Sequence, residues 1–292
     1  MSAESMNLAA LERISDYLTR HPRLIELADV REMTALGISE EQAVSLLFLA
    51  ALGVDEERSA RERELARRYI VPGIRKLEPQ VFRENPYMRE IRFPQAKLGR
   101  WQMTQLAYAP YEFFVRDDLA IMPDGREIVR LGYFDEEYVY PAVLQDGREW
   151  MTITPNEIAT MEDAIGKAHG HVAALGLGLG YFAFMASRKE AVERVTIVER
   201  DPEVIALFER HILPQFAQRE KVRIVQADAF EYVKREMASE NVDFAFVDLW
   251  HDVADGAELY LRMKMLEGCA PKTRFAYWIE TSIRSFLRGI AG

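Results

Sequence analysis

HVAALGLGLGYFAF, residues 171–184, runs from a short apolar segment through three glycines into a second apolar segment. Gly176, Gly178 and Gly180 stand at alternate positions directly after the first apolar run. Glycine adopts positive φ angles without strain, and because it has no Cβ it lets a ligand lie against the backbone. The pattern therefore predicts a strand, a tight turn and a helix, with a nucleotide-like ligand resting on the turn.

Three later apolar runs each end in an acidic residue. VTIVE ends at Glu199, about 20 residues after the glycines, where ribose-binding acids stand in nucleotide-binding α/β units. VRIVQAD ends at Asp228 and VDFAFVD ends at Asp248. Because ligands bind at the carboxyl ends of parallel strands, we expect these acids and the glycine turn to share one edge of a sheet. One such acid alone is also what a helix cap requires, but the series favours a binding site.

The glycine spacing argues against a dinucleotide site, because dinucleotide folds place a further glycine where this chain has Tyr181. The G-x-G-x-G spacing instead resembles the first motif of class I S-adenosylmethionine-dependent methyltransferases, over roughly residues 155–280. The resemblance implies S-adenosylmethionine as cofactor, Glu199 on its ribose, and Asp228 with Ala229 at the adenine edge. The implied cofactor site comprises Gly176, Gly178, Gly180, Glu199, Arg200, Asp228, Ala229, Asp248 and Trp250.

A closer likeness precedes the glycine turn. AVLQDGREWMTITPNEIATMEDAI, residues 142–165, resembles the stretch that links the small β-domain of spermidine synthases to their core. VTIVERDPEVIALF and the D-x-x-x-D spacing of Asp248 and Asp252 continue it. This chain departs from that family inside the glycine turn, where an acid is replaced by Leu177 and Leu179. It also departs where the family has a Tyr-His-Glu element and this chain has Ile158, Ala159 and Thr160.

These departures favour a methyltransferase built on a spermidine-synthase-like plan, with aminopropyl transfer as the alternative. Asp248 and His251 are the candidate general bases, because a carboxylate or a neutral imidazole can accept a proton near pH 7. Trp250 can face a sulfonium through a cation–π contact. Asp252 and Asp255 add negative charge that favours an amine-bearing small-molecule acceptor. His251 and the two acids also suit an ordinary surface loop, so a non-catalytic cofactor-binding or scaffolding module is a second alternative.

Composition limits the partners. The net charge of −10 argues against nucleic acid, whose binding requires clustered Lys and Arg. No apolar run approaches the roughly 18 residues of a membrane span, and the first residues lack a signal-peptide core, which predicts a cytoplasmic protein without membrane contact. The single cysteine, Cys269, predicts a small buried side chain, and no metal site is expected.

The periodicity changes twice along the chain. Residues 1–88 read as a helical domain in which Ser39 is an N-cap, and ERSARERELARRY, residues 57–69, reads as a solvated helix face. Residues 89–154 read as a small antiparallel β-unit with hairpin turns at Asp124-Gly125 and Asp146-Gly147. Residues 155–292 read as the Rossmann-like parallel-sheet core. The predicted fold class is therefore α/β, with this core preceded by the β-unit and the helical domain.

The last predicted strand, RFAYWIE, is followed only by TSIRSFLRGIAG. Methyltransferases of this class usually add two further strands, so this core is predicted either to lack that hairpin or to complete its edge with the N-terminal region or a partner subunit. Because an exposed edge invites pairing, the sequence favours a homodimer.

Overall fold

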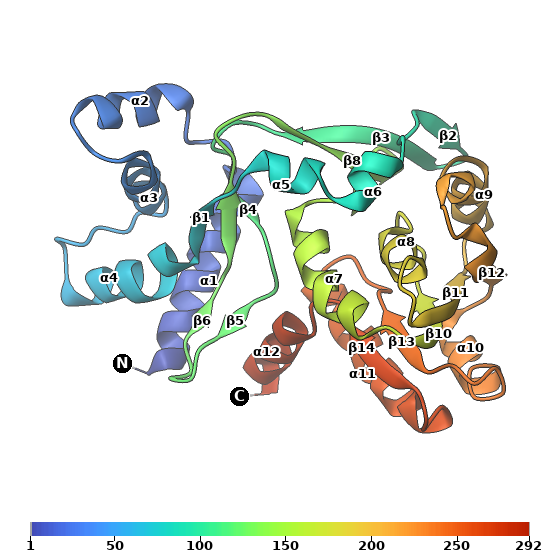
Figure 1. Ribbon diagram of the computed structural model, residues 1–292. Coiled ribbons are helices and arrows are strands. Elements are labelled where there is room, and N and C mark those ends of the chain that lie inside the picture. Colours follow the sequence, from blue (N-terminus) through green and yellow to red (C-terminus); the bar gives the residue numbers. More distant parts are fainter. Residues whose placement is uncertain (1, 292) are drawn as a thin grey trace. The chain divides into compact units, whose positions relative to one another are not determined.

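The predicted strands after residue 169 form one five-stranded sheet in the computed structural model, which describes residues 2–291. Every neighbouring pair in this sheet is parallel, and the strand order is β12-β11-β10-β13-β14. The strands are β10 (Gly170–Leu175), β11 (Val192–Glu199), β12 (Val222–Gln226), β13 (Phe244–Val247) and β14 (Arg274–Tyr277) (Figure 1). The chain therefore leaves β10 in opposite directions along the sheet, as in a Rossmann-like fold.

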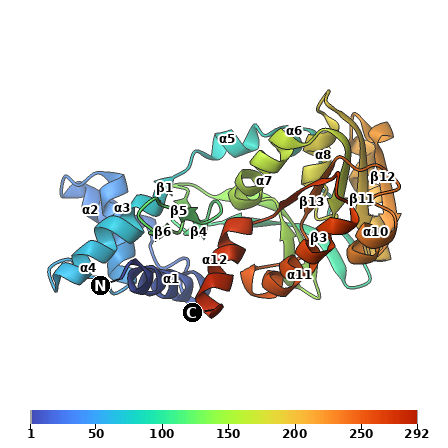
Figure 2. The same cartoon turned by 90° about the horizontal axis from the view of Figure 1, so that it is seen from below.

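Alternate side chains of these strands pack against helices on opposite faces of the sheet. Ala174 and Ile197 face the helices α7 (Pro155–Lys167), α8 (Tyr181–Ser187) and α9 (Pro202–His211). Ala173 and Val198 face α10 (Ala229–Arg235), α11 (Val253–Leu266) and α12 (Glu280–Ala291), and α11 lies beside α12 (Figure 2). The predicted α/β class and Rossmann-like core are confirmed.

Helix starts follow the local sequence. Asp201 caps α9 by accepting hydrogen bonds from the backbone of Glu203 (2.9 Å) and Val204 (3.3 Å), with Pro202 at the first helical position as predicted. Thr154 and Glu157 form a reciprocal capping box at the start of α7.

Packing divides the chain into two units. The helical unit comprises Met1–Val81 and Ala107–Val139, and the core unit comprises Phe82–Leu106 and Tyr140–Gly292. Each unit has buried apolar side chains of its own. The predicted division into three domains at residues 88 and 154 stays a prediction. Packing groups residues 107–139 with the N-terminal helices.

The helical unit begins with α1 (Ala3–Arg20), α2 (Leu27–Ala35), α3 (Glu40–Ala51) and α4 (Ala60–Glu64), followed by a π-helix (Leu65–Ile70) and a 3-10 turn (Val71–Gly73). Ser39 caps α3, as predicted. The solvated-face interpretation of residues 57–69 is wrong at Glu62, which is 8% exposed and takes two hydrogen bonds from Arg13 (2.8 and 3.0 Å). This bond, formed across 49 positions of sequence, lowers the pKa of Glu62.

The region predicted as one antiparallel β-unit forms several small sheets. In the helical unit, β1 (Ile74–Lys76) pairs parallel with β7 (Leu131–Tyr133), which pairs antiparallel with β4 (Phe114–Val115). A separate hairpin joins β5 (Ala120–Ile121) to β6 (Glu127–Ile128) through the predicted turn at Asp124-Gly125. The remaining strands form a four-stranded sheet: β2 (Ala96–Leu98), β3 (Trp101–Tyr108), β8 (Tyr138–Gln145) and β9 (Arg148–Thr152), with the predicted turn at Asp146-Gly147. Two short helices, α5 (Pro79–Arg83) and α6 (Pro86–Glu90), precede it.

Three further expectations concern Cys269, the edge of the parallel sheet and membrane-spanning helices. Cys269 is exposed rather than buried, because it ends a 3-10 turn, Glu267–Cys269, on the surface. Within residues 2–291 the parallel sheet gains no strand from the N-terminal region, so that route to completing its edge is wrong; the homodimer stays a prediction. None of the helices in this described range is both long and apolar enough to cross a bilayer.

Candidate active site

The three glycines of the turn have two different roles. All have positive φ angles: 102° at Gly176, 54° at Gly178 and 75° at Gly180. A Cβ on Gly176 would lie 2.0 Å from the backbone oxygen of Asp248, and one on Gly180 would lie 2.3 Å from the ring of Phe208. A Cβ on Gly178 would meet no atom within 4 Å. Gly176 and Gly180 therefore allow the protein to pack, whereas Gly178 borders open space.

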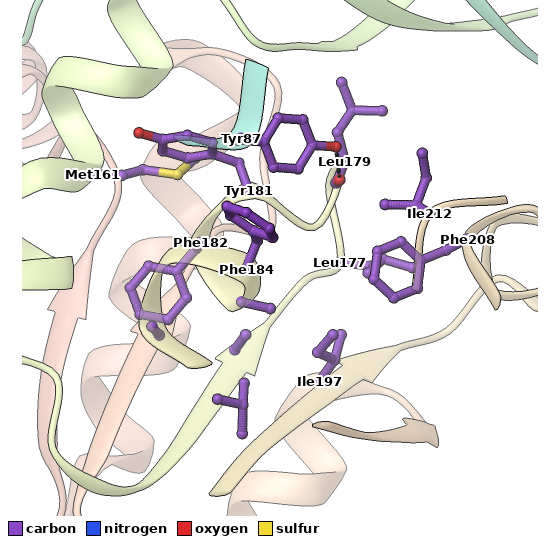
Figure 3. Close-up of a cluster of buried hydrophobic side chains, with 14 of the residues drawn as sticks. Tyr87, Met161, Leu177, Leu179, Tyr181, Phe182, Phe184, Ile197, Phe208 and Ile212 are labelled. Atoms are coloured by element: carbon purple, nitrogen blue, oxygen red, sulfur yellow. Dashed lines mark hydrogen bonds between the residues drawn. The ribbon is translucent and has the colours of Figure 1, made fainter. Parts of the chain in front are cut away.

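The two leucines between these glycines lie inside the protein. Leu177 is 5% exposed and Leu179 is 3% exposed, and Figure 3 shows both within a cluster that includes Tyr87 and Phe208. The Tyr87 hydroxyl donates a hydrogen bond of 2.6 Å to the backbone oxygen of Leu179. The turn thus presents no acidic side chain to the space above it.

A cavity of about 520 Å³ opens over this turn, entirely within the core unit. It lies where β10 and β13 end side by side, and the Asp248 amide donates a 2.9 Å hydrogen bond to the Leu175 oxygen there. This is the point at which the sheet's strand order reverses, the usual binding crevice of open α/β sheets. Nine of the ten residues predicted for the site line this cavity: Gly176, Gly178, Glu199, Arg200, Asp228, Ala229, Asp248, Trp250 and His251. Gly180 is not among the lining residues, because it packs against Phe208.

Glu199 connects the end of β11 to the glycine turn. One carboxylate oxygen accepts a hydrogen bond from the Leu177 amide (3.3 Å), and the other accepts from the amides of Arg200 (2.8 Å) and Asp201 (2.9 Å). Asp228 is exposed and caps α10 through the Glu231 amide at 3.1 Å. Both acids stand at the carboxyl edge of the sheet, as predicted from their positions after strands.

Asp248 carries the most perturbed carboxyl group of the cavity. Burial, with a further contribution from the negative charge of Glu157, raises the pKa of Asp248 to about 7. A carboxyl group that titrates at this pH can both accept and return a proton under physiological conditions. Perturbed titration in a cleft is typical of catalytic groups.

His251 has a different environment from Asp248. Its ring is exposed and stacks on Trp150 at 5.5 Å, with the planes 8° apart. Its amide donates to Asp255, and Asp252 and Asp255 together form the capping box of α11. The local role of Asp252 and Asp255 is therefore helix capping. Asp248 is a stronger base candidate than His251.

Trp250 lies between the cavity and the core. It is 6% exposed, its ring stacks on Tyr277 at 6.5 Å, and the absence of a side chain on Gly256 leaves space for it. Its Nε1 has no hydrogen-bond partner among the described residues. A cation–π role toward a sulfonium stays a prediction.

Sequence reasoning missed several residues of the cavity wall. Glu157 lines the cavity while accepting hydrogen bonds from the Thr152 hydroxyl (2.9 Å) and the Thr154 amide (3.0 Å). Trp101 lines it and donates from Nε1 to Asp201 at 3.0 Å. The T-x-x-E pattern of a capping box announces the start of a helix, but nothing local indicates that this start faces the glycine turn.

Comparison with known proteins shows a similarity over part of the chain. Residues 154–270 match the Spermine/spermidine synthase domain. This synthase-like segment covers less than half of the chain and begins at the cap of α7. Spermidine synthases share the fold of class I S-adenosylmethionine-dependent methyltransferases, so the superfamily expected from the glycine spacing is supported.

Solved structures give a partial similarity of the same kind. A spermidine synthase from Thermotoga maritima is 23% identical, with a TM-score of 0.29, over 37% of this chain and 39% of that one. A spermidine synthase in complex with the transition state analogue AdoDATO is 23% identical, with a TM-score of 0.28, over 37% of this chain and 38% of that one. This chain therefore matches well under half the length of each. No curated protein matches the sequence.

The synthase-like segment corrects the expected cofactor. S-adenosylmethionine as methyl donor is wrong, because spermidine synthases use decarboxylated S-adenosylmethionine as aminopropyl donor. The sequence interpretation weighted the missing acid of the glycine turn too heavily. It did not take into account that the fold could supply a carboxylate, such as Glu157, from another element.

Proposed function

We propose that this chain is an aminopropyltransferase that uses decarboxylated S-adenosylmethionine and a small amine acceptor. The observation that carries the proposal is the carboxyl group of Asp248, which titrates near neutral pH in the cavity above the glycine turn of the synthase-like segment. Transfer requires an ammonium acceptor to lose a proton before its nitrogen attacks. Asp248 in its ionised form is the group suited to take that proton.

The chemistry itself needs little from the protein beyond position. The donor's sulfonium supplies the leaving group: a C–N bond forms, the C–S bond breaks, and sulfur keeps the electron pair. The residues of the cavity would hold the acceptor nitrogen in line with that carbon and exclude water, which can lower the barrier by several kcal/mol. In this proposal Glu199 and Asp228, which line the cavity, would accept hydrogen bonds from ribose and adenine, and the adenosyl group would lie over Gly178.

The residues present fit a cationic donor. The glycine turn offers only Leu177 and Leu179, but Glu157 and Asp248 lie in the same cavity, and the charge of Glu157 acts on Asp248. Two carboxyl groups that share a cavity attract an ammonium group, because its charge offsets their mutual repulsion. This pair supports an amine, in donor and acceptor alike, over a neutral or anionic substrate.

The decisive experiment measures release of methylthioadenosine from decarboxylated S-adenosylmethionine with a series of short aliphatic diamines. We expect turnover that falls by at least about 100-fold in Asp248→Asn, in line with the loss of a general base. Glu209→Gln, an exposed acid of α9 outside the cavity, is the matched control and should leave the rate unchanged.

A non-catalytic adenosyl-binding module is the second candidate, favoured by the two buried leucines in the turn. Binding of methylthioadenosine without turnover of any amine would support this candidate against the first. If neither methylthioadenosine nor the donor binds in calorimetry, both candidates are wrong.

A further inference from the structure

Three arginines lie on one face of the small sheet in the helical unit. In this sheet β7 is central, and Arg75 of β1 and Phe114 of β4 both stand opposite Gly132. Arg116 lies two residues after Phe114 and Arg130 two residues before Gly132, and the Arg116 amide donates to the Arg130 oxygen at 2.8 Å. Since side chains alternate along strands, Arg75, Arg116 and Arg130 share a face.

The opposite face of this sheet belongs to the core of the helical unit, where Leu131 and Tyr133 are buried among helices. On the face with the arginines, neighbouring side chains fill the space above Gly132: a Cβ there would lie 2.8 Å from the side chain of Leu77, 3.0 Å from the ring of Phe114 and 3.1 Å from the Cβ of Arg116. A glycine here lets the aliphatic part of Arg116 lie close over the central strand.

Opposite charge is scarce around these side chains. Asp117 pairs with Arg130. Neither Arg75 nor Arg116 forms an ion pair or side-chain hydrogen bond within residues 2–291, and Nε of Arg116 is buried without a partner. Burial, followed by the charge of Arg75, lowers the pKa of Arg116. A buried donor without a partner reduces the stability of the fold, and strained or unsatisfied groups concentrate at functional sites.

We propose that Arg75, Arg116 and Arg130 form a binding site for a phosphoryl group of a small molecule. Three guanidinium groups and the Asp117 carboxylate leave a net charge of two, positive in sign, close to the charge of a phosphate dianion. Guanidinium groups bind phosphate oxygens in pairs, with a geometry that lysine does not offer. The net charge of −10 disfavours nucleic acid as the source of that phosphate.

The test uses the full chain and inorganic phosphate as the probe. We expect phosphate to raise the melting temperature above that measured in chloride at equal ionic strength, and ³¹P NMR to show saturable binding. Arg116→Gln and Arg75→Gln should each weaken the affinity about tenfold, the effect of losing one charge-assisted interaction. Arg31→Gln is the matched control, since Arg31 is an exposed arginine of α2 in the same unit.

Glycerol 3-phosphate distinguishes a phosphomonoester from free phosphate as the source, because a site adapted to an ester binds it more tightly than inorganic phosphate. The exposed Arg75 provides a variant that keeps the fold if Arg116→Gln does not. In chloride alone Arg116→Gln should melt no lower than the wild type, because it removes a repelled charge. Equal melting temperatures in phosphate and chloride, or phosphate affinity retained in both variants, would overturn the site. Binding of an acidic peptide but not of phosphate would assign this face to a protein partner instead.

Discussion

Asp248 shows at the scale of a residue how burial converts an ordinary carboxyl group into a base for neutral pH. Its neighbours in sequence are apolar strand residues, so the side chain leaves β13 at an edge where water is partly excluded. Glu157 adds negative charge from a different helix. The sequence shows neither the burial nor the nearby charge, so it does not distinguish Asp248 from Asp228, which is exposed and caps a helix.

The pKa of Asp248, about 7, predicts both activity and stability against pH. Turnover should rise as pH passes through 7, because only the carboxylate accepts a proton. The folded protein holds this proton to about pH 7, whereas an ordinary aspartate has a pKa of 3.8, so stability falls as pH rises between these values. Asp248→Asn should therefore abolish turnover and stabilise the protein above pH 7 by about 1–3 kcal/mol, since cavity water offsets part of the shift. Thermal melts from pH 4 to pH 8 measure this; a constant difference across that range would contradict it.

A substitution at Glu157 can separate its electrostatic effect on Asp248 from its role in capping α7. Glu157→Gln keeps the capping box, because glutamine also serves at that position. It removes the charge that raises the pKa of Asp248, so the acidic limb of the rate profile should move down by about half to one pH unit. Affinity for the amine-bearing donor should fall while affinity for methylthioadenosine, which lacks the amine, is kept.

Glu162→Gln on the same helix is exposed and outside the cavity, and it should change neither property. An unchanged rate profile in Glu157→Gln would show that Glu157 acts only as a cap.

At the scale of the element, the turn between β10 and α8 combines packing with binding. Gly180 must be glycine because α8 begins against the ring of Phe208, and Gly176 because β10 and β13 end in contact. Leu177 and Leu179 fix the turn on the apolar core, and Glu199 fixes it to β11. A turn held at this many points is rigid before any ligand arrives, which reduces the entropy lost on binding.

Alanine should have different effects at Gly180 and at Gly178: a loss of stability at the first and a loss of ligand binding at the second. Gly180→Ala places a methyl group 2.3 Å from Phe208 at a φ of 75°, so we expect a loss of roughly 2–4 kcal/mol in stability. Gly178→Ala meets no atom within 4 Å, so it should cost only about 1–2 kcal/mol for its positive φ. Its methyl group enters the cavity, however, and should weaken methylthioadenosine binding at least about tenfold. Chemical denaturation and calorimetry on the two variants separate the effects; equal losses of stability would contradict the assigned roles.

At the scale of the whole molecule, the two units bury separate apolar cores, and the binding cavity lies in only one of them. Methylthioadenosine should therefore slow hydrogen exchange of backbone amides in residues 170–250 and leave residues 3–70 unchanged, because a ligand stabilises the elements that it contacts. Exchange mass spectrometry with and without the ligand measures this. Equal slowing in both ranges would show that the units unfold as one.

Local patterns accounted for the sheet, the helix starts and the edge at which the site lies. Apolar runs, glycine spacing, and caps such as Ser39 and Asp201 depend on residues a few positions apart, so they can be read from the sequence. The same patterns located Glu199, Asp228 and Asp248, because an acid that ends a strand lies at the carboxyl edge whatever the rest of the fold does.

Contacts between distant positions decided the rest. Glu62 is buried by Arg13, Trp101 reaches Asp201 across 100 positions, and Glu157 acts on Asp248 from a helix that the chain enters long before β13. The amino-acid order alone specified where strands end and where glycines turn, since those properties depend on neighbouring residues. Only tertiary packing brought a second carboxylate to Asp248 and assembled three arginines around Gly132, because burial and charge at a point depend on every segment that meets there.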